Sequence, residues 1–297
     1  MKSLSLDFGA STLDMILWKD NEILNIKSFE SQKHKSISDI EKFLKLQKIN
    51  LKGIEKIYVT GGKSRFFENK ILDIPIIKVD EIFAIGRGGI YLYKKFVQKK
   101  LPEQILVASL GTGTCIVKCK MKNEKLKIKN NNQQFNNLTI SHIGGTGIGG
   151  GTFLGLCKEL LGETDISKLR KMFLKGDKRR VDLSVGEIVG SGIGIVSSEN
   201  TASNLGKLAR NVQFKKEDLA AGIVNLIGQA IGTNIVFAAK ANNVKEIVLI
   251  GKLIRFQEIT DIILEVAKIY GIQVHIPKNA EYGTGIGGVL AKGFFLC

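Results

Sequence analysis

The chain has 297 residues, with 44 Lys or Arg against 28 Asp or Glu, and a formal net charge of +16 at pH 7. This length accommodates one large or two medium domains with a substantial core. The basic residues are spread along the chain, and no basic stripe interleaved with aromatic residues stands out. We therefore expect a solvated surface that attracts phosphorylated anions, and no nucleic-acid partner.

Apolar segments and cysteines indicate the compartment. No apolar run reaches the ~18 to 20 residues that a membrane span needs, and the first residues lack the apolar core of a signal peptide. The cysteines stand mostly in apolar surroundings without Cys-x-x-Cys spacing, at Cys115, Cys119, Cys157 and Cys297. We expect a cytoplasmic protein with reduced thiols, no membrane association and no zinc site.

The first expected elements are a strand, a glycine-cornered turn and a returning strand over residues 4–18. Residues 105–120 repeat this order. In both segments the first glycine of the turn, Gly9 or Gly111, precedes an Asn-Glu dipeptide by 12 residues. We interpret the pattern as an internal duplication, which decides the fold class.

A later pair of expected strands supports this interpretation, because one ends at Gly61 and the other at Gly251. Strands alternate with helical segments, which predicts α/β layers. The two related halves should face each other across a cleft. We predict an N-terminal domain over residues 1–100 and a C-terminal domain over residues 101–297.

Apolar residues at helical spacing predict helices over residues 36–46, 81–97, 152–161, 165–173 and 216–241. The last of these is the longest, and its broad apolar stripe suits either a core helix or a dimer interface. Polar or glycine-rich composition predicts exposed loops over residues 126–140 and 190–204.

A glycine-dense stretch precedes the helix expected from residue 152. Six of the eight residues from Gly144 to Gly151 are glycine, which costs backbone entropy and supplies no side chain to bury. We interpret the stretch as a turn whose N–H groups bind a phosphate at the start of a helix, with a tight loop as the alternative. The predicted binding residues are Gly144, Gly145, Gly147, Gly149, Gly150 and Gly151.

The two hairpin turns offer further phosphate-binding groups. Asp7 ends the first strand, where its carboxylate could hold a hydrated Mg²⁺ that bridges phosphates, or could only cap the turn. The backbone N–H groups expected to face the phosphates belong to Gly9, Ala10, Ser11, Gly111, Thr112, Gly113 and Thr114.

Glu81 follows Asp80 at the start of an expected helix. A carboxylate there could accept the proton of a hydroxyl that attacks the γ-phosphate. From the residues alone we favour a capping role for this pair. Arg87 and Lys63 could bind an acidic substrate, but we expect both to be solvated surface charges.

These motifs, taken together, resemble those of the type II, eukaryote-like pantothenate kinases. The resemblance rests on the sequences at residues 149–157, 175–182 and 282–290, together with Asp7-x-Gly9 and Leu110-Gly-Thr-Gly-Thr114. It runs in order along nearly the whole chain, and its most specific part is residues 144–156.

The resemblance implies the duplicated ribonuclease H-like domains of the acetate and sugar kinase/Hsp70/actin fold with an interdomain cleft, a homodimer, and ATP with Mg²⁺. It implies phosphorylation of pantothenate to 4'-phosphopantothenate, the first step of coenzyme A biosynthesis, with acyl-CoA as a candidate regulator. By motif, Glu81 would be the catalytic base and Asp7 the magnesium ligand, and Gly251 would lie near the adenosine. Glu81, His142 and Thr146 would contact the substrate.

Two positions depart from the family pattern. The family usually has Lys seven residues after the first Asp, where Asp14 stands, and Arg two residues before the glycine stretch, where His142 stands. Both departures remove positive charge where negative charge must be stabilised. These departures keep open a catalytically weak paralogue that binds acyl-CoA or pantothenate derivatives as a sensor, or a paralogue with another substrate such as pantetheine. A separate alternative is an ATP-binding activator of the same fold, a class that carries a cysteine-ligated iron–sulfur cluster.

Overall fold

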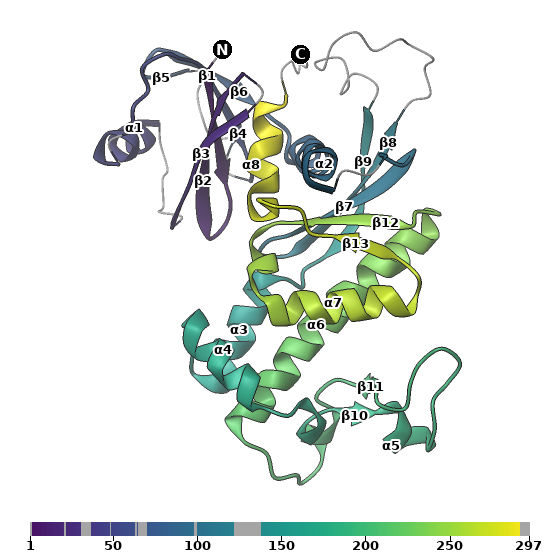
Figure 1. Ribbon diagram of the computed structural model, residues 1–297. Helices are drawn as coiled ribbons and strands as arrows, with labels where there is room; N and C mark the ends of the chain where they lie inside the picture. Colours follow the sequence, from purple (N-terminus) through teal and green to yellow (C-terminus); the bar gives the residue numbers. More distant parts are fainter. Residues whose placement is uncertain are drawn as a thin grey trace.

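Two mixed β-sheets, with a pair of helices between them, organise the protein (Figure 1). The computed structural model describes residues 2–20, 22–30, 37–47, 49–62, 64, 70–97, 100–121 and 138–291. The first sheet has the order β3-β2-β1-β4-β6-β5. Its strands are β1 (Lys2–Phe8), β2 (Thr12–Lys19), β3 (Glu22–Glu30), β4 (Ile54–Thr60), β5 (Lys70–Ile71) and β6 (Ile74–Lys78).

The second sheet repeats the topology of the first. Its strands are β7 (Gln104–Leu110), β8 (Thr114–Met121), β9 (Leu138–Thr146), β12 (Glu246–Ile250) and β13 (Gln273–His275), in the order β13-β12-β7-β8-β9. In each sheet three antiparallel strands are followed by two parallel ones: β4 and β6 extend from β1 as β12 and β13 extend from β7. The predicted duplication and the duplicated α/β fold are confirmed.

Helices cover both outer faces. The α-helices of the described residues are α1 (Ile37–Leu46), α2 (Glu81–Leu92), α3 (Gly150–Leu161), α4 (Ile166–Lys175), α5 (Val185–Val189), α6 (Lys216–Ala241), α7 (Gln257–Ile269) and α8 (Gly283–Val289), and five of them lie on the outer faces. α1 packs on the outer face of the first sheet through Ile40, Phe43 and Leu44. α3, α4, α6 and α7 share one core with the outer face of the second sheet.

The last helix of each half lies in the layer between the sheets. α2, which a π-helical turn (Tyr93–Val97) continues, packs against β7, β8, β9 and β12, while α8 packs against β1, β2 and β4. α2 and α8 approach so closely that a Cβ at Gly88 would collide with the carbonyl oxygen of Gly283. The predicted boundary near residue 100 falls between the strands of the two sheets, but α2 and α8 each pack on the sheet of the other half, and the domain division stays a prediction.

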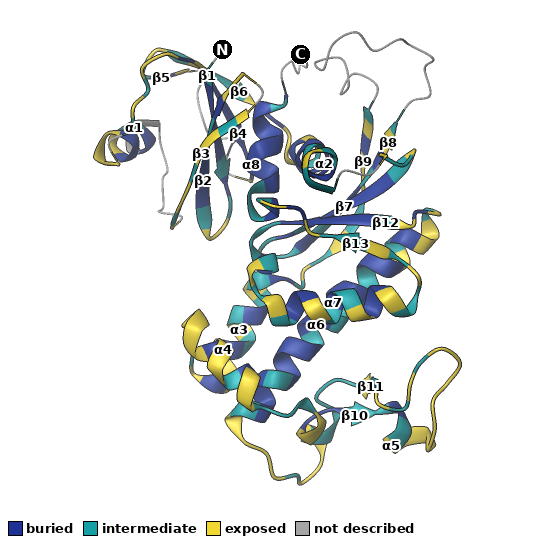
Figure 2. Cartoon of the chain, viewed as in Figure 1, coloured by how far each residue is buried: buried dark blue, intermediate teal, exposed yellow. Residues whose placement is uncertain are grey.

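The long helix α6 matches its predicted range and is a core element. Ile223, Ile227, Ile231 and Ile235 are at most 1% exposed, and Figure 2 shows the buried residues along this helix. Among the described residues, α6 alone has the length and apolarity of a membrane span, and 67% of its most apolar window is buried inside the protein. Such burial is that of a core helix.

Three expectations are corrected. Residues 138–140 are not a loop but the start of β9, because they pair with β8; the rest of the predicted loop, residues 126–137, lies outside the described residues. Within the loop predicted over residues 190–204, β11 (Thr201–Ser203) pairs with β10 (Leu183–Ser184). Arg87 is only 5% exposed, because α2 is enclosed between the sheets. Lys63 lies outside the described residues.

Candidate active site

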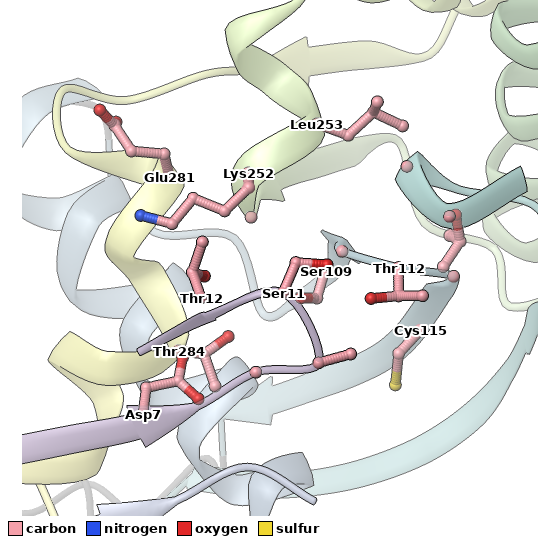
Figure 3. Close-up of a pocket in the computed structure, with 18 of the residues that line it drawn as sticks. Asp7, Ser11, Thr12, Ser109, Thr112, Cys115, Lys252, Leu253, Glu281 and Thr284 are labelled. Atoms are coloured by element: carbon pink, nitrogen blue, oxygen red, sulfur yellow. The ribbon is translucent and has the colours of Figure 1, made fainter. Parts of the chain in front are cut away.

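A cavity of about 630 Å³ lies where the hairpin turns of the two halves meet. Its lining from the first half is Asp7, Phe8, Gly9, Ala10, Ser11, Thr12, Asp14, Gly62 and Glu81. Its lining from the second half is Ser109, Gly111, Thr112, Gly113, Thr114, Cys115, Thr146, Gly150, Gly151, Phe153, Leu154, Gly251, Lys252, Leu253, Phe256, Glu281 and Thr284. Most residues singled out in the sequence are therefore brought together, and Figure 3 shows several of them around this space.

Both hairpin turns open onto the cavity because they connect equivalent strand pairs. In the first half Phe8 pairs with Leu13, so residues 9–12 form the turn. In the second half Leu110 pairs with Thr114, and the turn is one residue shorter. All the predicted turn residues line the cavity.

The glycine stretch follows β9 and packs directly on the second turn. Gly150 N donates to Gly111 O at 2.8 Å, and Gly151 N donates to Thr112 O at 2.9 Å. A Cβ on Gly149 would lie 2.6 Å from Thr112 O, so glycine is required there for close packing between backbones. This packing role was not expected from the sequence.

Only part of the glycine stretch reaches the cavity. Gly150, Gly151 and Thr146 line it, whereas the lining does not include Gly144, Gly145, Gly147 and Gly149. The first two of these lie in β9, opposite β8. The nucleotide-binding role of these four glycines stays a prediction.

Glu81 and Asp80 have separate roles at the start of α2. Asp80 is the N-cap, and its Oδ1 accepts from Ile82 N at 2.9 Å and from Phe83 N at 3.4 Å. Glu81 does not cap the helix and lines the cavity. Desolvation in the cavity wall, and then the neighbouring Asp80 charge, raise the pKa of Glu81 above its usual value. A carboxylate with a raised pKa is suited to accept a proton near neutral pH.

Asp7 stands in an excess of negative charge. Burial, followed by the nearby charges of Asp14 and Glu81, raises its pKa to about 8. A divalent cation at this carboxylate would relieve the repulsion. The chemistry fits Mg²⁺, which proteins often hold through one or two carboxylates together with phosphate oxygens. Among the described residues no group of three or more His, Cys, Asp or Glu gathers as a self-contained metal site.

The two ends of the cavity differ in polarity. Four apolar side chains, Phe153 and Leu154 from α3 and Leu253 and Phe256 from the segment after β12, line one end. The rings of Phe153 and Phe256 meet edge to face with centroids 4.9 Å apart. The remaining lining side chains include carboxylates and hydroxyls. This combination can hold a flat apolar group next to an anionic one.

His142 lies outside the residues that line the cavity. It is exposed on β9 and pairs with Val117. Directly paired residues share a face of a sheet, and Val117 is buried in the layer of α2. His142 therefore lies on the α2 face of β9, and its contact with a substrate stays a prediction.

The sequence analysis did not predict one ion pair of the cavity, between Lys252 and Asp14. Lys252 Nζ lies 2.8 Å from Asp14 Oδ1 and joins the two halves across the cavity. The one available signal was the position of Lys252 directly after Gly251, at the end of a strand. Cys115 also lines the cavity, and burial together with the charges of Glu81 and Asp80 raises the pKa of its thiol to about 11.

Comparison with known proteins identifies relatives along nearly the whole chain. A type II pantothenate kinase of Oceanobacillus iheyensis is 28% identical over 294 residues, 98% of this chain and 100% of that protein. A type II pantothenate kinase of Bacillus cereus is 26% identical over 252 residues, 84% of this chain and 83% of its own.

Solved structures share the fold at low sequence identity. Component A of the Acidaminococcus fermentans (R)-2-hydroxyglutaryl-CoA dehydratase has a TM-score of 0.60 at 17% identity and covers 98% of this chain and 96% of its own. A ROK family glucokinase of Streptomyces griseus, in complex with glucose and AMPPNP, has a TM-score of 0.57 at 9% identity and covers 98% and 99%. These likenesses agree with the duplicated fold.

The family model named Fumble matches residues 11–272, which include the second hairpin, the glycine stretch and the strand that ends at Gly251. The chain therefore belongs to the Fumble family, the type II pantothenate kinase family.

Proposed function

We propose that the protein is an ATP-dependent kinase that phosphorylates pantothenate to 4'-phosphopantothenate, the first step of coenzyme A biosynthesis. The names of its relatives support this activity. The observation that carries the proposal is the position of Glu81, a carboxylate of raised pKa on the wall of a cavity that both hairpin turns also line.

The cavity suits a nucleoside triphosphate. The half-buried side chains of Leu154 and Phe256, backed by the buried Phe153 and Leu253, fit a purine base, and the two hairpin turns fit the phosphates. Backbone N–H groups bind phosphate oxygens without a side chain that would have to be ordered. Gly251 lines the cavity next to the end of β7, where its Cβ would lie 2.6 Å from Leu110 O, and we place the sugar there.

The reaction needs little covalent participation from the protein. The primary hydroxyl oxygen of pantothenate attacks the γ-phosphorus, the bond from that phosphorus to the β-bridging oxygen breaks, and ADP leaves. Glu81 accepts the hydroxyl proton as the new O–P bond forms. Asp7 would hold Mg²⁺, whose charge neutralises the phosphate oxygens.

Three finer features belong to the same proposal. We place the protein in the cytoplasm as a homodimer, and we propose that an acyl-CoA competes at the cavity. Exposed apolar side chains support association between copies, including Phe237 on α6 at 56% exposure and Ile195 at 66%. Size-exclusion chromatography with light scattering measures the molar mass in solution. A monomer at micromolar concentration would contradict the proposed homodimer.

An ADP-release assay tests the activity, with pantothenate, pantetheine and a panel of sugars as acceptors. We expect ADP to form in a one-to-one ratio with phosphopantothenate, and only with pantothenate present. Release with pantetheine alone would support the different-substrate paralogue. ATP binding without transfer to any acceptor would support an activator or a sensor.

A further inference from the structure

The charged groups that line the cavity are unevenly divided. Among the described lining residues there are four carboxylates, Asp7, Asp14, Glu81 and Glu281, and one cationic side chain, Lys252. A triphosphate brings further negative charge into this space. Backbone N–H groups and one divalent cation offset part of it, so the position of the single ammonium decides how well the remainder is neutralised.

Lys252 is held in a defined place by groups of the other half. It opens the 3-10 helix Lys252–Arg255 directly after β12, and its Nζ contacts Asp14 Oδ1 on β2 at 2.8 Å and Ser28 Oγ on β3 at 3.3 Å. Ser28 Oγ in turn donates to Asp14 Oδ1 at 2.6 Å. The ammonium lies 3.8 Å from the centroid of the Tyr282 ring. Figure 3 shows Lys252 extending from its helical turn toward Thr12 of the first half.

Burial distinguishes this ion pair from a surface one. The side chain of Lys252 is 22% exposed and that of Asp14 is 6% exposed. A pair so deeply buried loses much of its Coulomb attraction to the cost of desolvation, and is weak evidence for stability. The pair also joins the two halves beside Asp7, which pairs with Asp14 across the first hairpin. A charge in this position faces whatever anion enters between the turns.

We propose that Lys252 is a phosphate-binding residue of the nucleotide site and that Asp14 anchors it there. The inference rests on the proposed function to the extent that the ligand is ATP. The lysine that the family resemblance implies at position 14 is thereby supplied from the opposite half, and the charge at position 14 is inverted to hold it. In this arrangement the positive charge at the site is retained rather than lost.

The test is the affinity for ATP, ADP and adenosine, measured by isothermal titration calorimetry without a second substrate. Lys252→Met should weaken ATP binding about 10- to 100-fold, because a charge-assisted contact is lost, and should change adenosine binding less than about twofold. Lys252→Arg keeps the charge and should stay within about fivefold for ATP.

Two further variants control for structural effects. Arg255→Met alters a cation of the same helical turn that also contacts Tyr282 but does not line the cavity, and it should leave all three affinities unchanged. The double variant Asp14→Lys with Lys252→Glu reverses the pair and places the ammonium on the first half. It should recover most of the ATP affinity that Lys252→Met loses.

The outcomes separate this inference from the proposed function. If Lys252→Met weakens adenosine and ATP equally, or if it leaves ATP affinity unchanged in a folded protein, the inference is overturned. If the reversed pair binds ATP as weakly as Lys252→Met, the anchoring by Asp14 is overturned. If ATP affinity depends on Lys252 as expected but the wild-type protein does not phosphorylate pantothenate, only the proposed substrate is overturned.

Discussion

The two halves share one topology and differ in the chemistry of the equivalent positions. At the end of the first hairpin the paired residues are Asp7 and Asp14, whereas Ser109 and Cys115 occupy that position in the second. Both pairs line the cavity. The same backbone arrangement therefore carries carboxylates in one half and uncharged hydroxyl and thiol groups in the other.

The start of the last helix shows the same contrast. α2 opens with Glu81, while α8 opens with Gly283 and presents Thr284 to the cavity. After the fourth strand of each sheet the cavity is lined by Gly62 in the first half and by Lys252 in the second. We infer a division of labour, in which the first half supplies three of the four carboxylates and the second half supplies the lysine, while both hairpin turns contribute to phosphate binding.

The largest effect should follow from removing the acid of the first half. Glu81→Gln keeps the size of the side chain but cannot accept a proton. We expect kcat to fall about 10²- to 10⁴-fold, the usual contribution of a general base, with the ATP dissociation constant unchanged. Steady-state ADP release and calorimetry measure the two quantities.

Asp80→Asn is the matched control for Glu81. Asn caps a helix about as well as Asp, so the hydrogen bonds to Ile82 N and Phe83 N are retained. We expect kcat within about threefold of wild type, because Asp80 does not line the cavity and desolvation, the main cause of the raised Glu81 pKa, is retained. Full activity of Glu81→Gln would remove the assignment of the base.

The contact between the halves gives the next largest effect. In Gly88→Ala the new methyl group would collide with the carbonyl oxygen of Gly283, so α2 and α8 must separate. We expect a loss of about 3 kcal/mol in unfolding free energy, measured in urea. Gly155→Ala on α3 has no atom within 4 Å of its new methyl group and should be neutral or slightly stabilising.

The sequence was sufficient for features that repeat or that are local. The duplication was readable from the spacing of Gly9 and Gly111, and α6 was readable from its apolar period. Both signals survive because each half must bury one sheet between two helical layers. The sequence also predicted that both hairpin turns line one cavity, because equivalent turns at equivalent strand ends meet in a duplicated fold.

What could not be predicted depends on contacts between distant segments. Arg87 was expected to be a solvated surface charge, yet it is 5% exposed because α2 lies between two sheets. The ion pair of Lys252 with Asp14 joins residues 238 positions apart, and no local pattern encodes it. Gly149 was assigned to a phosphate-binding turn, with a tight loop as the alternative, and its close approach to Thr112 could not be predicted because it arises from packing between distant segments.

A direct way to break the contrast is to give the second half the carboxylate of the first. Ser109→Asp places a negative charge at the position equivalent to Asp7, on the side that we assign to phosphate binding. We expect ATP affinity to fall about 10- to 100-fold through like-charge repulsion. Ser109→Asn, of similar size and uncharged, should stay near wild type, and equal losses in both variants would point to crowding instead.

The smallest effects should distinguish two hydroxyls of the second turn. Thr114 Oγ1 donates to Ile148 O at 2.8 Å and is buried, so it fixes the glycine stretch; Thr112 is exposed on the cavity wall. Thr114→Val should therefore lower the unfolding free energy by about 1 kcal/mol. Thr112→Val should leave stability unchanged and raise the ATP dissociation constant about three- to tenfold, because one hydrogen bond to a phosphate is lost. If both variants change stability alone, the hydroxyls of this turn serve its packing, and phosphate binding there rests on the backbone N–H groups.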